Sequence, residues 1–94
     1  MMSKIVEKIR KSIRITTDEF DDQIEDYVDF VHKDLVSHAM DERNWSTVDP
    51  LVYMCCELYC KYMFDYENKG EWYHTRYLAL RDNMVTMMRY INAE

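Results

Sequence analysis

Apolar residues recur every three or four positions along most of this chain, and that spacing predicts amphipathic helices. Ile5, Ile9 and Ile13 are spaced by four, so we expect a short helix over Ser3–Arg14 with a basic outer face. A longer helix is predicted over Thr17–Met40. Its apolar stripe contains Phe20, Ile24, Tyr27, Val28, Val31, Leu35 and Ala39.

The second helix is predicted to have an acidic start and an acidic solvent face. Thr16 and Glu19 stand at the spacing of a capping box, which indicates that the helix begins there. Acidic side chains fill its first turns, where the helix dipole favours negative charge. The outer face continues with Asp22, Glu25, Asp26 and Asp29.

The third helix is predicted over Pro50–Asn68, after a connection of residues 41–48 from which Trp45 is expected to fold back onto the core. Asp49 as N-cap and Pro50 at the first helical position are a strong start signal. The run LVYMCCELYCKYMF is apolar on most faces. A helix apolar nearly all round is expected to be buried.

These elements predict an all-α fold in a single domain, residues 1–94. Gly70 is expected to end the third helix, and a fourth helix is predicted over Glu71–Asn92. The short connections favour an antiparallel four-helix bundle with the third helix buried. Residues on the apolar stripes are expected to be largely buried, among them Ile24, Val28, Cys55, Cys56, Met63 and Leu80.

Composition supports a few long helices and a surface for association. The chain has 94 residues with only one glycine and one proline, so few positions can break a helix. A chain this short buries a modest core, and oligomerisation is a common remedy. Eight tyrosines and eight methionines are present. Since tyrosine buries area yet keeps a polar tip, part of this set is expected at an interface and the rest in the core.

Charge is divided unevenly along the chain, whose net charge is −6. Residues 1–14 hold five basic residues and one acidic residue, whereas residues 15–94 hold seven basic and seventeen acidic residues. The acidic balance argues against a protein that grips nucleic acid by neutralising phosphates. The basic segment is either a solvated helix face or a contact surface. Its candidate contact residues are Lys4, Lys8, Lys11 and Arg14.

The three cysteines do not indicate a disulfide framework, a metal site or a nucleophile. Cys55, Cys56 and Cys60 cluster in the most apolar segment, where we expect reduced thiols acting as small core residues. Cys56 and Cys60 are four residues apart, but a structural zinc site needs four ligands, and no histidine forms a spaced pair with them. No GxSxG motif or glycine-rich turn is present. We therefore expect no catalysis, cofactor or metal.

The sequence also predicts a protein made in a cytoplasm. Residues 1–14 lack the continuous apolar stretch of a signal peptide. No window approaches the 18 or so uncharged apolar residues that a membrane-spanning helix needs, so no membrane association is expected.

Several short motifs resemble the head–tail connector (DNA-packaging adaptor) family of tailed bacteriophages. Ile13–Ile15 (IRI), a short acidic turn and Asp21–Asp22 at a long helix start are similar to that family's Leu-Arg-Ile followed by an acidic helix start. Pro50 opens an apolar segment ending in Tyr66–Lys69 (YENK), where the family shows Tyr-Glu-Asn-Arg. A helix ending near Met88–Tyr90 also fits, so the resemblance covers nearly the whole chain.

The resemblance implies a structural virion protein, assembled in the cytoplasm of a bacterial host. Such proteins form a ring below the portal of a capsid, bind the portal and the tail or stopper proteins, and let DNA pass without specific binding. An acidic channel wall would repel phosphates, and the residues expected to border the channel are Asp22, Glu25, Asp26 and Asp29. Alternatively, this face is outermost and merely solvated.

Two other classes remain open on the residues alone. One is a small cytoplasmic interaction module, such as a regulator or an antitoxin-like partner, which would form a stable complex with one unrelated protein. The other is an enzyme or metal protein, which stoichiometric zinc in metal analysis would support. A neighbouring gene for a portal, capsid or tail protein would favour the connector.

Overall fold

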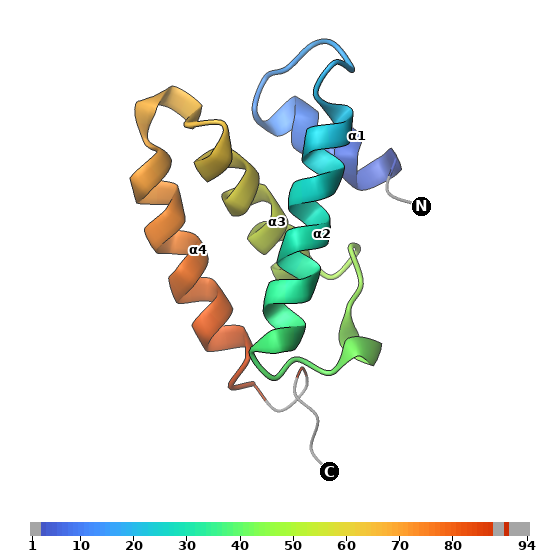
Figure 1. The fold of residues 1–94 in the computed structure, drawn as a ribbon, viewed down its shortest axis with the longest axis vertical. Helices are drawn as coiled ribbons and strands as arrows, with labels where there is room; N and C mark the ends of the chain where they lie inside the picture. Colours follow the sequence, from blue (N-terminus) through green and yellow to red (C-terminus); the bar gives the residue numbers. More distant parts are fainter. Residues whose placement is uncertain (1–2, 88–89, 91–94) are drawn as a thin grey trace.

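Four α-helices and two short 3₁₀ helices make up the computed structural model, which describes residues 3–87 and 90 (Figure 1). The described part contains no strand, so the predicted all-α class is confirmed. The elements are α1 (Ser3–Ser12), α2 (Asp21–Ser37), η1 (Glu42–Asn44), α3 (Pro50–Met63), η2 (Tyr66–Asn68) and α4 (Gly70–Met84).

Helices α2, α3 and α4 lie beside one another, and the short α1 lies across the end at which α2 begins (Figure 1). Helix α3 contacts each of the other three helices, and it packs most extensively on α4. The buried residues of α3 are Val52, Cys55, Cys56 and Cys60.

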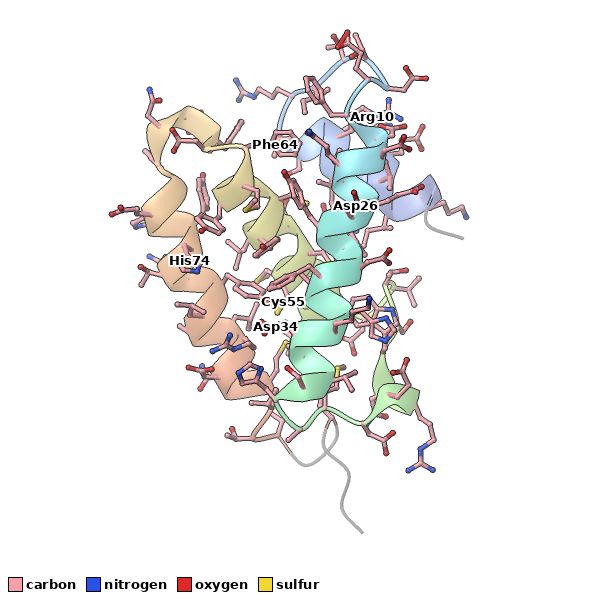
Figure 2. The ribbon with its side chains drawn as sticks, viewed as in Figure 1. Arg10, Asp26, Asp34, Cys55, Phe64 and His74 are labelled. Atoms are coloured by element: carbon pink, nitrogen blue, oxygen red, sulfur yellow. The ribbon has the colours of Figure 1, made fainter. Side chains whose placement is uncertain are left out.

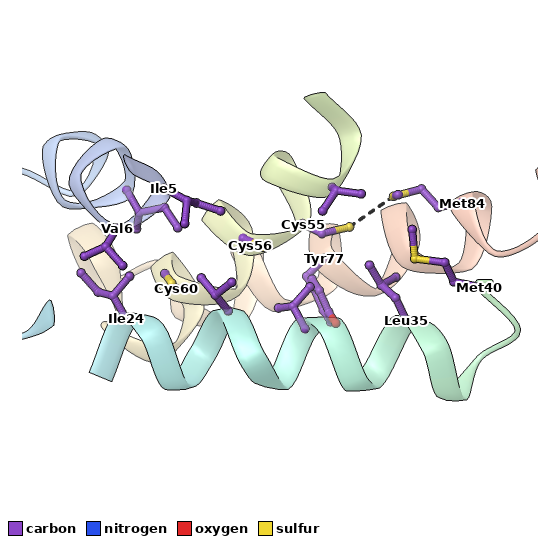
Figure 3. Close-up of a cluster of buried hydrophobic side chains, with 14 of the residues drawn as sticks. Ile5, Val6, Ile24, Leu35, Met40, Cys55, Cys56, Cys60, Tyr77 and Met84 are labelled. Atoms are coloured by element: carbon purple, nitrogen blue, oxygen red, sulfur yellow. Dashed lines mark hydrogen bonds between the residues drawn. The ribbon is translucent and has the colours of Figure 1, made fainter. Parts of the chain in front are cut away.

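The core forms where the apolar stripes of the four helices meet around α3 (Figure 3). As predicted, Ile24, Val28, Cys55 and Cys56 are fully or almost fully buried. Leu80 is only partly buried against this cluster. The remaining buried apolar residues of the helices are Ile5, Val6, Ile9, Val31, Leu35, Val52, Cys60, Tyr73, Tyr77 and Met84.

The prediction that Met63 is buried is wrong, because 42% of this residue is exposed. Met63 is the last residue of α3. That helix is apolar on nearly every face, so hydrophobic periodicity cannot select which of its apolar residues face the core. The exposed Met54 of the same helix illustrates the same ambiguity.

The predicted start of α2 is also wrong. The helix begins at Asp21, and Phe20 at its N-cap position makes no side-chain capping bond. The Thr17 hydroxyl oxygen accepts a bond from the backbone N–H of Glu19 at 3.4 Å, within a local turn. Threonine hydroxyls favour such turns outside helices, so the Thr16 and Glu19 signal marks a turn before the helix.

Helices α1 and α2 end earlier than predicted, at Ser12 and Ser37, and in each case the second residue after the end has left-handed backbone. Arg14 has φ of 62° and Ala39 has φ of 94°. The backbone N–H of Ile15 donates to the carbonyl of Arg10 at 3.0 Å, and that of Met40 donates to the carbonyl of Leu35 at 3.1 Å. This six-to-one bond defines a Schellman motif, which closes a helix end.

The connection between α3 and α4 differs from the prediction, because α3 ends at Met63 and Gly70 opens α4. Asp65 has a left-handed backbone, and its carboxylate accepts the Gly70 N–H at 2.8 Å. A Cβ on Gly70 would lie 2.7 Å from that carboxylate oxygen and 3.2 Å from the carbonyl of Tyr62. Glycine therefore permits a close approach at the start of α4, which ends at Met84; position 92 lies outside the described residues.

The predicted start of α3 and the placement of Trp45 are confirmed. Asp49 is the N-cap, and its carboxylate accepts the N–H groups of Leu51 at 2.9 Å and Val52 at 3.2 Å. Trp45 packs against the core, with its ring stacked on His32 at a centroid distance of 4.4 Å.

Candidate interaction surfaces

The outer face of α1 carries a row of three lysines. Lys4, Lys8 and Lys11 are exposed, and their i, i+4, i+7 spacing places them on one side of the helix. The opposite side of α1 is buried in the core. Arg14 is also exposed, but it lies beyond the helix in the left-handed turn. We call Lys4, Lys8 and Lys11 the basic row.

The basic row is largely free within its own chain. Among the described residues, Lys4 and Lys11 form no ion pair or cation–π contact. Lys8 is different, because its Nζ lies 4.1 Å from the ring centroid of Tyr53 in α3. Lys8 therefore contributes to the packing of α1 on α3, while the other two lysines extend into solvent.

The outer face of α2 carries a row of three aspartates with the same spacing. Asp22, Asp26 and Asp29 are all exposed, and none of them takes part in an ion pair within the described part of the chain. We call these three residues the acidic row. Glu25, which was predicted to belong to this face, is half-buried and faces α1 instead.

Helices α1 and α2 contact each other through residues that belong to neither row. Arg10 of α1 binds Asp21 of α2, with Nε 3.1 Å from Oδ1 and Nη2 3.4 Å from Oδ2. Arg10 lies where α1 crosses the start of α2 (Figure 2). A hollow of about 340 Å³ lies between the two helices beside this pair. Its lining residues are Lys4, Val6, Glu7, Arg10, Asp21 and Glu25.

Glu57 of α3 fixes the other side of α1. The Ser12 hydroxyl donates to the Glu57 carboxylate, which also accepts from the Tyr53 hydroxyl at 3.5 Å. Lys61 lies 3.8 Å from the same carboxylate. Burial and the neighbouring Glu57 carboxylate raise the pKa of Tyr53, so its hydroxyl stays protonated and can donate.

A second hollow opens beside the basic row, on the side where α1 meets the loop before α3. It measures about 240 Å³, and its lining residues are Lys4, Ile5, Lys8, Thr47, Val48 and Tyr53. Val48 is 87% exposed. The hollow thus combines apolar walls with two lysines.

Phe30 is an exposed aromatic residue beside the acidic row. It is 46% exposed, and its ring stacks on Tyr59 with centroids 4.8 Å apart and an interplanar angle of 20°. The stacking holds the ring in place while one face remains open to solvent. On α2, Phe30 lies one helical turn after Asp26 and directly follows Asp29.

A polar cluster around Asp34, which the sequence pattern did not predict, joins α2 to α4. The Tyr77 hydroxyl donates to Asp34 at 2.6 Å, Arg81 Nη1 donates to it at 3.2 Å, and His38 Nδ1 lies 3.4 Å from its other oxygen. Burial and this hydrogen bond raise the pKa of Tyr77. Tyr77 and Arg81 are four residues apart and therefore lie on the same face of α4, which is the sequence feature that could have indicated this cluster.

The three cysteines are free thiols in the core. Burial raises the pKa of Cys55 and of Cys60 to about 12 and also raises that of Cys56. A thiol with so high a pKa is a poor nucleophile at neutral pH. Within residues 3–87 and 90, no three histidine, cysteine or acidic side chains are grouped to hold a metal ion.

Most of the aromatic residues pack within the molecule, and Trp72 is the main exception. Trp72 is 51% exposed on the outer face of α4, where the guanidinium of Arg76 lies 4.3 Å from its ring centroid.

The helices of the described part are too short or too polar to cross a membrane. Comparison with known proteins finds no matching family, no matching curated protein and no matching solved structure.

Proposed function

We propose that this chain is a structural virion protein, a head–tail connector that assembles as a ring below the portal of a tailed bacteriophage. The observation that carries the proposal is the presence of two oppositely charged, exposed rows on different helices, without ion pairs in the described chain. Closed rings require two different complementary surfaces on each subunit. The sequence resemblance to connector proteins agrees with this arrangement.

The proposal includes an antiparallel four-helix bundle with α3 as its buried helix. Support comes from the contacts of α3 with α1, α2 and α4. It also comes from the four α3 residues with no exposed surface, which are Val52, Cys55, Cys56 and Cys60. The core is small, so contacts between subunits would add to its stability.

Net charge supports a ring through which DNA passes without being held. The chain carries a net charge of −6, and phosphates are repelled by an acidic surface. Portal and tail or stopper proteins would bind the ends of the ring. In this role the protein needs no metal, cofactor or catalytic group.

The experiment is electron microscopy of the purified chain, alone and mixed with a portal ring encoded beside it. We expect closed rings, either free or docked coaxially on the portal, and no DNA retention at physiological salt. A chain that forms no ring under either condition would contradict the proposal. Native mass spectrometry showing a stable complex with one unrelated protein would instead favour a small interaction module.

A further inference from the structure

We infer that the basic row of one copy binds the acidic row of the next copy, with Phe30 of the second copy entering the hollow beside α1. This contact deepens the proposed function and rests on it, since it names the surfaces that join neighbouring subunits. It also assigns the acidic row to a neighbouring subunit rather than to the DNA channel.

The two rows have matched spacing. Lys4, Lys8 and Lys11 are separated by four and then three residues, and Asp22, Asp26 and Asp29 have the same separations. At 1.5 Å per residue, each row is about 10 Å long. Two rows of equal length and opposite charge can therefore pair along their whole length.

The position of Phe30 favours antiparallel pairing of α1 of one copy with α2 of the next. Asp26 and Lys8 are the middle residues of their rows. At 3.6 residues per turn, each is displaced around its helix axis in the same direction from the other two residues of its row. Phe30 lies on the Asp26 side of the acidic row, and the hollow lies on the Lys8 side of the basic row. Helices that meet face to face bring these corresponding sides together only when they are antiparallel.

The antiparallel arrangement also brings Phe30 to the level of the hollow along the helix axis. It places Asp29 opposite Lys4, at the end of α1 where the hollow opens. Phe30, the residue after Asp29, then arrives at the hollow itself. A cavity of about 150 Å³ can hold a benzene ring, so a hollow of about 240 Å³ has room for this side chain.

Charged pairs and apolar contacts contribute differently to this interface. The lysine–aspartate pairs lie in solvent, so they orient the copies and speed their encounter more than they add affinity. Affinity then depends on the desolvated ring of Phe30 against Val48 and Tyr53, since buried aromatic residues are the usual anchors of interfaces. The Tyr59 stack fixes the ring before binding, which lowers the entropic cost.

The test uses charge reversal in the full chain, followed by sedimentation velocity and native mass spectrometry at low and high salt. One variant carries Lys4→Glu and Lys11→Glu, and the other carries Asp22→Lys and Asp29→Lys. Lys8 is left unchanged because it packs on Tyr53 within its own chain. Circular dichroism checks that each variant stays helical.

We expect each double reversal to weaken self-association about tenfold or more at low salt, because it places like charges opposite each other. A chain with all four substitutions, or an equal mixture of the two double variants, should restore association. If the fourfold variant does not fold, the mixture of the two double variants still tests whether restoring opposite charges restores association. Phe30→Ala should weaken association at both salt concentrations.

A control reverses one exposed cation elsewhere, Lys69→Glu, and should leave association unchanged. The inference is overturned if the wild-type chain stays monomeric at all concentrations at low salt. It is also overturned if rings form equally well with reversed rows, which would leave the connector proposal standing. A charge-dependent closed dimer would support the contact and count against the ring.

Discussion

Replacing Asp49 with alanine is expected to destabilise the fold by about 2–4 kcal/mol, because this carboxylate supports two parts of the chain at once. It caps α3 by accepting the N–H groups of Leu51 and Val52. It also accepts the Tyr90 hydroxyl, which lies 2.9 Å from Oδ1 and 3.0 Å from Oδ2. The sequence pattern alone predicts only the first contribution.

The magnitude follows from these two contributions. Removing an N-cap costs about 0.5–2 kcal/mol. A hydrogen bond to a charged group contributes about 1.5–3 kcal/mol, and Tyr90 is only 2% exposed, so its hydroxyl would lose its charged acceptor in a buried place. Asp49→Asn keeps a good capping residue but removes the charge, so a smaller loss is expected.

Urea denaturation followed by circular dichroism measures the loss, and a double-mutant cycle with Tyr90→Phe separates the two contributions. We expect a coupling of about 1–3 kcal/mol between Asp49 and Tyr90. Thr17→Ala is the matched control, because Thr17 lies before α2 and should change stability by less than about 0.5 kcal/mol. A coupling near zero, with Asp49→Ala no worse than a lost cap, would refute the reasoning.

The remaining predictions concern the core and one helix end. Ile24→Ala should cost about 2–5 kcal/mol in the same urea assay, and Leu80→Ala should cost less because Leu80 is only partly buried; equal losses would contradict this packing. Ala39→Gly should raise the melting temperature, since the left-handed backbone at φ of 94° costs a residue with a Cβ about 1–2 kcal/mol; a lower melting temperature would show that Ala39 is unstrained. Cys55 and Cys60 should react with a thiol reagent at pH 8 only after unfolding, because the raised pKa and burial protect them; rapid reaction in the native state would contradict their burial.

Periodicity and capping signals determined the number of helices and the composition of much of the core. The spacing of apolar residues in α2 identified Ile24 and Val28 as buried, because α2 has one polar face and one apolar face. Asp49 and Pro50 located the start of α3, since N-capping is a local interaction between neighbours in sequence. Charge along the sequence likewise identified the helices that carry the two rows.

The helix ends required the tertiary structure. Ala39 and Arg14 adopt left-handed backbone although neither is a glycine, so the sequence contained no signal for these ends. Position 70, where α4 begins, is a glycine because Asp65 and Tyr62 approach its backbone too closely for a Cβ. That approach depends on how the chain folds back after α3, which no local pattern reports.

The surfaces also depended on how the helices pack. Periodicity assigned Glu25 to the acidic face, but the proximity of α1 turns it toward a shared hollow. Lys8 lies on the basic row, yet the packing of α1 on α3 places it over Tyr53. The sequence by itself determined which residues are charged and on which helix they lie. Only the tertiary structure decided which of them stay free for a partner, because neighbouring helices bury or bind the others.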